Sequence, residues 1–436
     1  MQWISSGNSP LWRSLRHRNY RLYLTGQLIS VCGTWMQQVA QSWLVYRLTE
    51  SATLLGVVGF ATQIPVFLLG AIGGVVSDRY SGYRVAVWTQ SAALLQAVLL
   101  AALTLSGLVQ PIHIIILGSV LGIVNAFDMP ARQALVHKLV SAEDLPNAVA
   151  LNSSMINAAR IIGPGVAGVI VAAVGEGACF TINAISYLAV IIALLAMRFT
   201  PETVRSSNPA SLAHSLNEGL RYILDTVPIR DVLLLLSIVG LMGMPYITLM
   251  PVFAADIHKG GADALGLMMG AIGLGALGGA LGLARRKSVI GLGRVIAFAT
   301  VGFGLGLIAF SFSKPFLLSL LLLIGVGTGW MVQIAACNTA LQTLAEDRMR
   351  GRVMSLFSMM LVGMAPFGSL VAGWASDRIG APSVVAIGGA GCMLAGLLFA
   401  WRLPHLIAAA RPILVARGII IEPTGGGETV GIDATR

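Results

Sequence analysis

The sequence predicts an all-α polytopic membrane protein, with twelve transmembrane helices in two pseudo-symmetric six-helix halves. The chain is 56% hydrophobic and only 11% charged, its apolar runs are long, and they fall into two groups of six. A helix needs about 20 predominantly apolar residues to cross the hydrocarbon core of a bilayer. An average soluble domain has roughly a quarter of its residues charged, so this composition excludes an ordinary cytosolic globular protein.

The expected spans are apolar windows separated by charged residues, proline and glycine. The connections between them are short except for 199–230, which separates six spans from six. The windows lie at about 22–46, 54–76, 84–106, 112–136, 148–174, 178–198, 231–255, 264–284, 294–312, 316–344, 353–376 and 382–401.

The long connection is expected to be a cytoplasmic linker that contains an amphipathic helix. Leucine and isoleucine recur at helical spacing from Ser211 to Leu224, which favours a short helix on the membrane surface. After Pro404 there is no apolar run of span length. The chain thus divides into a cytoplasmic N-terminal segment 1–21, an N-terminal half 22–198, a linker 199–230, a C-terminal half 231–401 and a mobile cytoplasmic tail 402–436.

The net charge of +10 reflects the orientation of the chain in the membrane. Lys and Arg fall between the apolar runs and are not interleaved with aromatic residues, so we exclude a nucleic-acid partner. Alternation of the spans puts nearly all basic residues on one side and leaves Arg47, Lys259, Lys314 and Arg378 on the other. Because cytoplasmic loops are enriched in Lys and Arg, we expect a plasma (inner) membrane protein with both termini cytoplasmic. The first twenty residues lack the apolar run of a signal peptide.

The two halves repeat each other in sequence. Leu55-Gly56 corresponds to Leu265-Gly266 and Ala142-Glu143-Asp144 to Ala345-Glu346-Asp347, in the same order, and Pro164 pairs with Pro366. These matches indicate an internal duplication. Paired six-helix halves place a substrate site at their interface near the middle of the bilayer.

Ionisable residues inside the spans are the most informative local feature, because charge in a membrane is costly and faces a cavity or a partner. Asp128 and Arg132 lie one helical turn apart in the fourth span, and Arg160 lies near the midplane of the fifth. If these two helices are neighbours, Asp128 and Arg160 reach similar depth and can pair. Arg84 is a competing partner for Asp128. Asp128 and Arg160 either brace the helix bundle or take part in transport. In transport, Arg160 can attract an anionic group of a substrate.

Polar and methionine residues on four spans are candidates for the wall of a substrate cavity. Polar rows also arise as hydrogen-bonded contacts between helices, and methionine also fills gaps in apolar cores, so both interpretations stay open. The candidates are Gln37 and Gln41 on the first span, Ser153 and Asn157 on the fifth, Trp330, Gln333 and Asn338 on the tenth, and Met360 on the eleventh.

The connection after the second span forms a tight charged turn that can lock neighbouring helix ends. It contains Gly74, Asp78, Arg79, Gly82 and Arg84 and resembles the signature loop of the major facilitator superfamily. The strings at 30–49, 126–133 and 152–168 resemble the subgroup that contains the enterobactin exporter and macrolide efflux pumps. Gly163, Pro164 and Gly168 are similar to a helix-packing motif associated with antiporters.

The resemblance implies a secondary transporter that exports an amphipathic small molecule, siderophore-like or drug-like, by alternating access. Proton antiport needs a group inside the membrane that changes protonation, and Asp128 is the carboxyl expected to serve. Multidrug or macrolide efflux, or a carrier of lipid-like substrates without proton coupling, is the alternative. The expected partners are a small-molecule substrate, protons and membrane lipids, and the expected state is a monomer.

Two other classes of protein are disfavoured. No lysine follows a glycine, so a phosphate-binding loop of an ATP-driven transporter is absent from the sequence. A membrane enzyme would need a general base, but no histidine lies deep in a span. The four cysteines lie in apolar segments without metal-like spacing, so we expect no metal and no cofactor.

Overall fold

The computed structural model describes residues 10–198, 212–286 and 288–417, and the regular secondary structure in these residues is helical. The first half consists of η1 (Pro10–Arg16), α1 (Arg18–Thr49), α2 (Ala52–Arg79), α3 (Gly82–Leu105), α4 (Pro111–Leu139), α5 (Leu145–Val174) and α6 (Glu176–Leu195). Helix α7 (Leu212–Asp225) lies in the linker. The second half consists of α8 (Val227–Ile238), η2 (Val239–Gly243), α9 (Pro245–Thr248), α10 (Met250–Val252), η3 (Phe253–Ile257), α11 (Ala262–Ala284), α12 (Leu292–Ser311), α13 (Phe316–Leu344), α14 (Arg350–Ile379) and α15 (Ala381–Ala416).

Eleven helices in the described ranges are long and apolar enough to cross a membrane. The segment from α8 to η3 counts as one of them, because Val227–Ile257 is a single broken span. Helix α1 occupies the remaining position of a twelve-helix bundle. It has 32 residues but a low mean hydropathy, since it carries Gln27, Gln37 and Gln41 on its buried side. The twelve-helix, two-half architecture is therefore that expected from the sequence.

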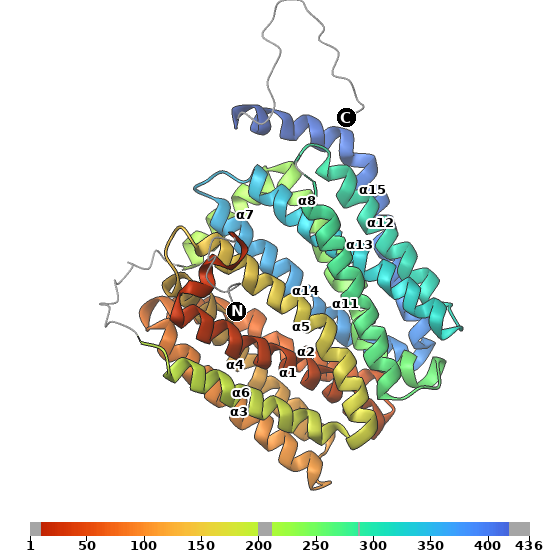
Figure 1. Ribbon diagram of the computed structural model, residues 1–436. Helices are drawn as coiled ribbons and strands as arrows, with labels where there is room; N and C mark the ends of the chain where they lie inside the picture. Colours follow the sequence, from red (N-terminus) through yellow and green to blue (C-terminus); the bar gives the residue numbers. More distant parts are fainter. Residues whose placement is uncertain (1–9, 199–211, 287, 418–436) are drawn as a thin grey trace, which may run out of the picture.

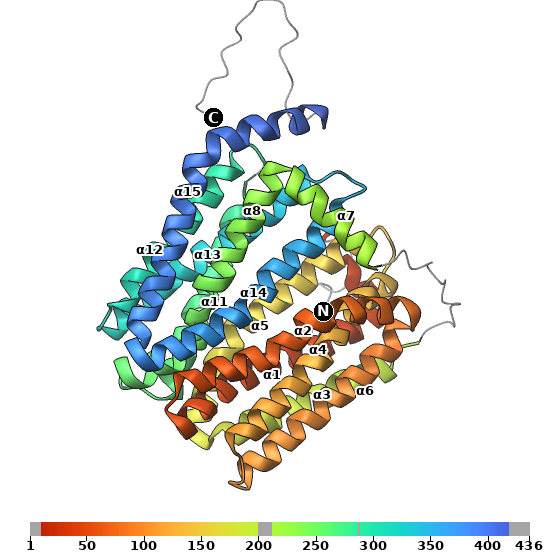
Figure 2. The same ribbon diagram turned by 180° about the vertical axis from the view of Figure 1, so that it is seen from behind.

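The two halves meet along two pairs of helices. Helix α2 packs on both α4 and α14, and α5 packs on both α1 and α11. Figures 1 and 2 show the first half in red to yellow and the second in green to blue. We call the end of the bundle that carries α7 and the connections α4–α5 and α13–α14 the linker side. The opposite end, with the connections α1–α2 and α14–α15, is the far side.

Helices α2 and α14 diverge toward the linker side. Four glycines lie on one stripe of α2 at helical spacing. A Cβ built at Gly56 would lie 2.5 Å from the Ser369 carbonyl oxygen of α14, and one at Gly59 would lie 3.7 Å from the Ser369 Cβ. At Gly70 and Gly74, nearer the linker side, a Cβ would meet nothing within 4 Å. The backbones therefore touch on the far side and separate toward the linker side.

Helices α5 and α11 behave in the same way. A Cβ at Gly168 would lie 2.7 Å from the Ala262 carbonyl oxygen, and one at Gly266 would lie 2.7 Å from the Pro164 carbonyl oxygen. Further along α5 toward the linker side, Ser153 is exposed. Gly56 and Gly266, which the sequence matched as repeats, thus make equivalent close contacts between the halves.

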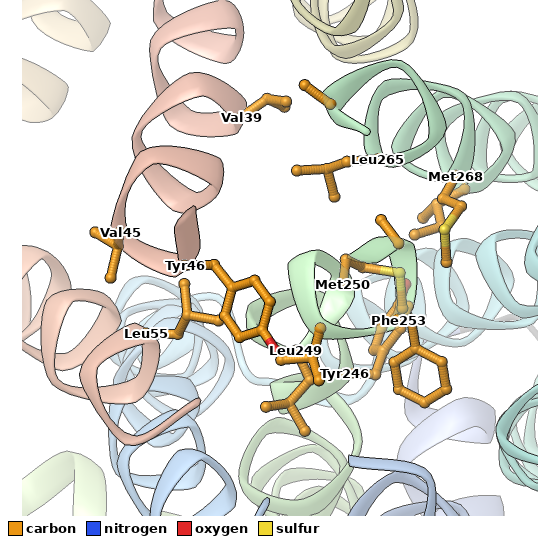
Figure 3. Packing of buried hydrophobic residues seen from close by; sticks show 14 of the residues in the cluster. Val39, Val45, Tyr46, Leu55, Tyr246, Leu249, Met250, Phe253, Leu265 and Met268 are labelled. Carbon is orange, nitrogen blue, oxygen red and sulfur yellow. The ribbon is translucent and has the colours of Figure 1, made fainter. Parts of the chain in front are cut away.

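The buried apolar clusters agree with this shape. One cluster joins both halves on the far side, where Val39, Tyr46 and Leu55 of the first half face Leu249 and Leu265 of the second (Figure 3). The clusters nearer the linker side each belong to one half. The molecule is closed on the far side and open on the linker side.

The C-terminal region differs from the expectation of a mobile tail from residue 402. Helix α15 continues to Ala416 with Pro404 and Pro412 inside it, and it bends to lie across the end of the bundle (Figure 1). A proline removes one hydrogen bond and kinks a helix without always ending it. The rest of the predicted tail, 418–436, lies outside the described residues.

Ion pairs and hydrogen bonds fasten the linker helix and the N-terminal segment to the bundle. Glu218 of α7 pairs with Arg352 at 2.5 Å, at the start of α14. His17 contacts Asp144 at 2.9 Å, and the Tyr20 hydroxyl donates to the Ala148 carbonyl at 2.8 Å. The hydrogen bond from His17 holds the pKa of Asp144 below its usual value.

Candidate functional site

A cavity of about 430 Å³ lies between the two halves. Its wall is mostly apolar, with a few polar side chains from each half, as is typical of small-molecule sites. Five residues predicted from the sequence line it: Gln37, Gln41, Arg160, Pro164 and Trp330.

Arg160 lies between two tryptophans from opposite halves. Its guanidinium carbon is 5.3 Å from the ring centroid of Trp35 on α1 and 5.6 Å from that of Trp330 on α13. Its Nε is buried without a hydrogen-bond partner. Among the described residues that line the cavity, Arg160 is the only one with an ionisable side chain. Insertion scales put the cost of an arginine at the centre of a spanning helix at about 3 kcal/mol.

The structure does not pair Asp128 with Arg160 or with Arg84. The Asp128 carboxylate contacts the Arg132 Nε of the same helix at 2.5 Å. It also accepts hydrogen bonds from the Thr89 hydroxyl at 2.8 Å and the Gln90 amide at 2.9 Å, both on α3. The expected pair required α4 and α5 to be neighbours. They contact each other only slightly, because α4 packs mainly on α2 and α3 whereas α5 packs mainly on α1 and α11.

Asp128 is 1% exposed and lies outside the cavity wall. Arg132, which pairs with Asp128, also donates a hydrogen bond to the Gln27 side-chain oxygen on α1 at 2.8 Å. The network therefore ties α1, α3 and α4 together inside the first half.

Gln37 has both a structural and a cavity position. Its amide donates to Gln96 of α3 at 3.2 Å, and its oxygen accepts from Asn183 of α6 at 2.7 Å. These two bonds fix the side chain at the cavity wall. Gln41, one turn further on, lines the same wall.

The other predicted cavity residues lie elsewhere. Asn157 donates to the Ser153 backbone carbonyl at 2.9 Å on the open side of α5, Asn338 bonds Gln342 on its own helix, and Met360 accepts from the Ser237 hydroxyl at 3.0 Å. Gln333 is completely buried, and neither atom of its amide group has a partner.

The residues of the predicted lock lie at the end of α2 and the start of α3. The backbone of Asp78 belongs to α2, and its side chain lies outside the described residues. Arg79 and Arg84 are exposed, and Gly74 faces open space, while a Cβ at Gly82 would lie 3.1 Å from the Ala131 carbonyl oxygen of α4. In the packing motif, Gly163 faces Trp35 of α1 and Gly168 faces α11.

Two contacts that close the far side were missed by the sequence analysis. The Asp377 carboxylate of α14 accepts from the backbone N–H groups of Ala52 at 2.8 Å and Thr53 at 2.9 Å, at the N-terminus of α2. The Tyr46 hydroxyl donates to Asp256 at 2.5 Å across the two halves. A signal for Asp377 exists, because Gly373-x-x-Ser-Asp-Arg378 repeats the pattern Gly74-x-x-Ser-Asp-Arg79.

A second buried carboxylate was also missed, because Asp231 is the first residue of the seventh predicted span, 231–255, where a charge is expected to face water. Asp231 lies inside the span Val227–Ile257 and is 6% exposed. Arg230 and Arg402 lie within 3.4 Å and 3.2 Å of it. The approach of Arg402 from α15 could not be read from local sequence. In the described ranges no cluster of histidine, cysteine and acidic residues could hold a metal ion.

In the described part of the chain, twelve long helices in two halves around a central, mostly apolar cavity define a membrane transporter of the major facilitator type. The family model described as "Transmembrane secretion effector" (MFS_3) matches residues 9–414. The chain therefore belongs to this family of transporters and is not an enzyme.

Curated relatives agree with this assignment. The chain is 27% identical to the staphyloferrin A transporter of Staphylococcus aureus over 87% of its own length and 95% of the relative. It is 25% identical to the multidrug efflux pump Tap of Mycolicibacterium fortuitum, over 90% and 98% of the two chains. The enterobactin exporter EntS of Citrobacter koseri is also 25% identical, over 92% and 96%.

Solved structures show the same fold. A mutant of the peptide transporter POT, in complex with sulfate, superposes with a TM-score of 0.73 at 12% identity, over 89% of this chain and 95% of that chain. A bacterial homologue of the lysosomal transporter Spinster, in an inward-facing and unoccupied conformation, gives 0.66 at 14% identity, over 94% and 98%.

Proposed function

We propose that this transporter exports an amphipathic small molecule, siderophore-like or drug-like, from the cytoplasm by alternating access. The observation that carries the proposal is the central cavity, which is lined by residues of both halves. The bundle around it is closed at the far side and open at the linker side. Relatives named for siderophore transport and multidrug efflux support the direction and the class of substrate.

The linker side is the cytoplasmic side in this proposal, with both termini inside. Arg348, Arg350 and Arg352 near the connection α13–α14 contribute to its excess of positive charge. The conformation described here is then inward-facing, ready to take substrate from the cytoplasm.

Proton antiport is the coupling we propose for export. Asp128 is its candidate residue, and a proton on Asp128 would release Arg132 from its ion pair. Such a step needs the first half to open around α4, since Asp128 is 1% exposed here. The same burial favours the second candidate, a carrier that works without proton coupling and in which Asp128 only braces the half.

Counterflow in proteoliposomes tests the carrier, and an imposed pH gradient tests the coupling. Vesicles loaded with unlabelled substrate should accumulate labelled substrate transiently, which a channel cannot do. Inside-out vesicles with an acidic interior should take up siderophores or macrolides faster than vesicles without a gradient. Uptake that ignores the gradient in both wild type and Asp128→Asn would exclude proton coupling through Asp128 and leave the uncoupled carrier.

A further inference from the structure

The cavity carries a positive charge without a counter-ion. Arg160 is in contact with two tryptophan rings, and its Nε has no partner. Among the described residues, no carboxylate lines the cavity, and Asp128 is already paired with Arg132. Arginine stays protonated in proteins, so the cavity holds a fixed charge that a ligand can neutralise.

A polar group beside Arg160 also lacks a partner. The Trp330 Nε1, on one of the two rings that flank the guanidinium, is buried without a hydrogen-bond partner. This group is a donor, and buried donors without partners are rare in folded proteins. A ligand that offers acceptor oxygens would satisfy it together with the guanidinium.

We infer that the substrate is an amphipathic organic anion whose carboxylate binds Arg160 between Trp35 and Trp330. A planar guanidinium can bind a carboxylate through two parallel hydrogen bonds. The apolar body of the anion would lie against the largely apolar wall. This inference rests on the proposed function and narrows it, because the same positive cavity disfavours the cationic compounds among drug-like substrates.

The site also joins the two halves. Trp35 and Arg160 belong to the first half, and Trp330 belongs to the second. An anion held by Arg160 and Trp330 together would therefore contact both halves at once. Its binding can bias the equilibrium between conformations in which the distance between these side chains differs.

Three probes with one aromatic body test the charge preference. They are 1-pyrenebutyrate, 1-pyrenebutanol and 1-pyrenebutylamine, and their binding to the full-length protein in nanodiscs is followed by energy transfer from tryptophan to pyrene. We expect the carboxylate to bind at least 30-fold more tightly than the amine, as for a buried charge pair. Equal binding of all three probes would overturn the inference.

Substitution of Arg160 tests the residue. Arg160→Gln should lose roughly 30-fold in affinity for the carboxylate and leave binding of the alcohol unchanged. Arg221→Gln, which removes an exposed charge from α7, is the matched control and should keep the preference. A carboxylate preference that persists in Arg160→Gln would overturn the site.

Two further measurements keep the result decisive. If Arg160→Gln does not fold, Arg160→Lys is tested instead. It should still bind the carboxylate more tightly than the amine, although with lower affinity. A folded Arg160→Lys variant that binds both probes equally would contradict a site based on charge. Counterflow separates this inference from the proposed function. If the protein exchanges the alcohol and the amine as readily as the carboxylate, the proposed export function is retained and the proposed anion site is overturned.

Discussion

Buried charge in this protein takes two forms that differ in whether a partner is present. Asp128 and Arg132 satisfy each other and three further polar side chains inside the first half. Arg160 faces the cavity without a carboxylate. A residue of the first kind should matter for stability, and one of the second kind for binding.

The first prediction concerns the Asp128–Arg132 pair. Asp128→Asn should cost about 3 kcal/mol of stability, because removal of one member leaves a poorly solvated charge behind. The double variant Asp128→Asn/Arg132→Gln should lose less than the sum of the two single variants. Thermal unfolding of the purified proteins in detergent measures all three, and strictly additive losses would show that the two side chains are not coupled.

At the scale of the helix, the far side is closed by a cap that comes from the other half. The N-terminus of α2 has backbone N–H groups without partners in its own helix, and Asp377 of α14 accepts two of them. A carboxylate at a helix N-terminus is stabilised by about 1 kcal/mol by hydrogen bonding and the helix dipole.

Asp377→Asn should therefore weaken far-side closure by about 1 kcal/mol, which is roughly a fivefold shift toward the outward-open state. The readout is labelling of a cysteine introduced at Gln38, in the cavity wall, by a membrane-impermeant maleimide added from the far side. Asp225→Asn removes an exposed acid from α7 on the linker side and is the control. Equal labelling in the two variants would argue against the cap.

Two glycines on α2 give a matched pair of substitutions. In Gly56→Ala the new Cβ would lie 2.5 Å from the Ser369 carbonyl oxygen, so α2 and α14 must move apart. In Gly70→Ala the Cβ meets nothing within 4 Å. We expect Gly56→Ala to lower the midpoint of thermal unfolding and Gly70→Ala to leave it unchanged. Similar losses in both variants would contradict the close contact on the far side.

Across the whole molecule, the sequence predicted the number of helices and their division into two halves. These follow from apolar length and repetition, which are local properties. It did not predict which helices pack together, and for that reason it offered Arg160 and Arg84 as partners of Asp128 instead of Arg132 on the same helix. Asp377 was missed because its partner is the backbone of a helix more than 300 residues away in the chain, although its segment repeats the Gly-x-x-Ser-Asp-Arg pattern of residues 74–79.

The two halves should work only if the far side can open. Ser51 Oγ and Asp377 Oδ2 are 3.0 Å apart, so Ser51→Cys/Asp377→Cys places two thiols near each other across the far-side contact. Oxidation should abolish counterflow, and a reductant should restore it. The single variant Ser51→Cys should be insensitive to oxidant, since three of the native cysteines are buried. Undiminished counterflow in the cross-linked protein would exclude alternating access through this face.

The unpaired charge of Arg160 also has an electrical consequence. The linker side is cytoplasmic in our proposal, so the empty cavity is open to the cytoplasm. The positive charge of Arg160 is then at the negative electrical potential of the cytoplasm in an energised membrane. A potential of 100 mV acts on a charge that crosses the whole field with about 2.3 kcal/mol, so voltage would hold the empty protein inward-facing. A bound monoanion cancels that charge. The loaded cavity could then turn outward without work against the field, and the membrane potential itself would discourage cycles that carry nothing.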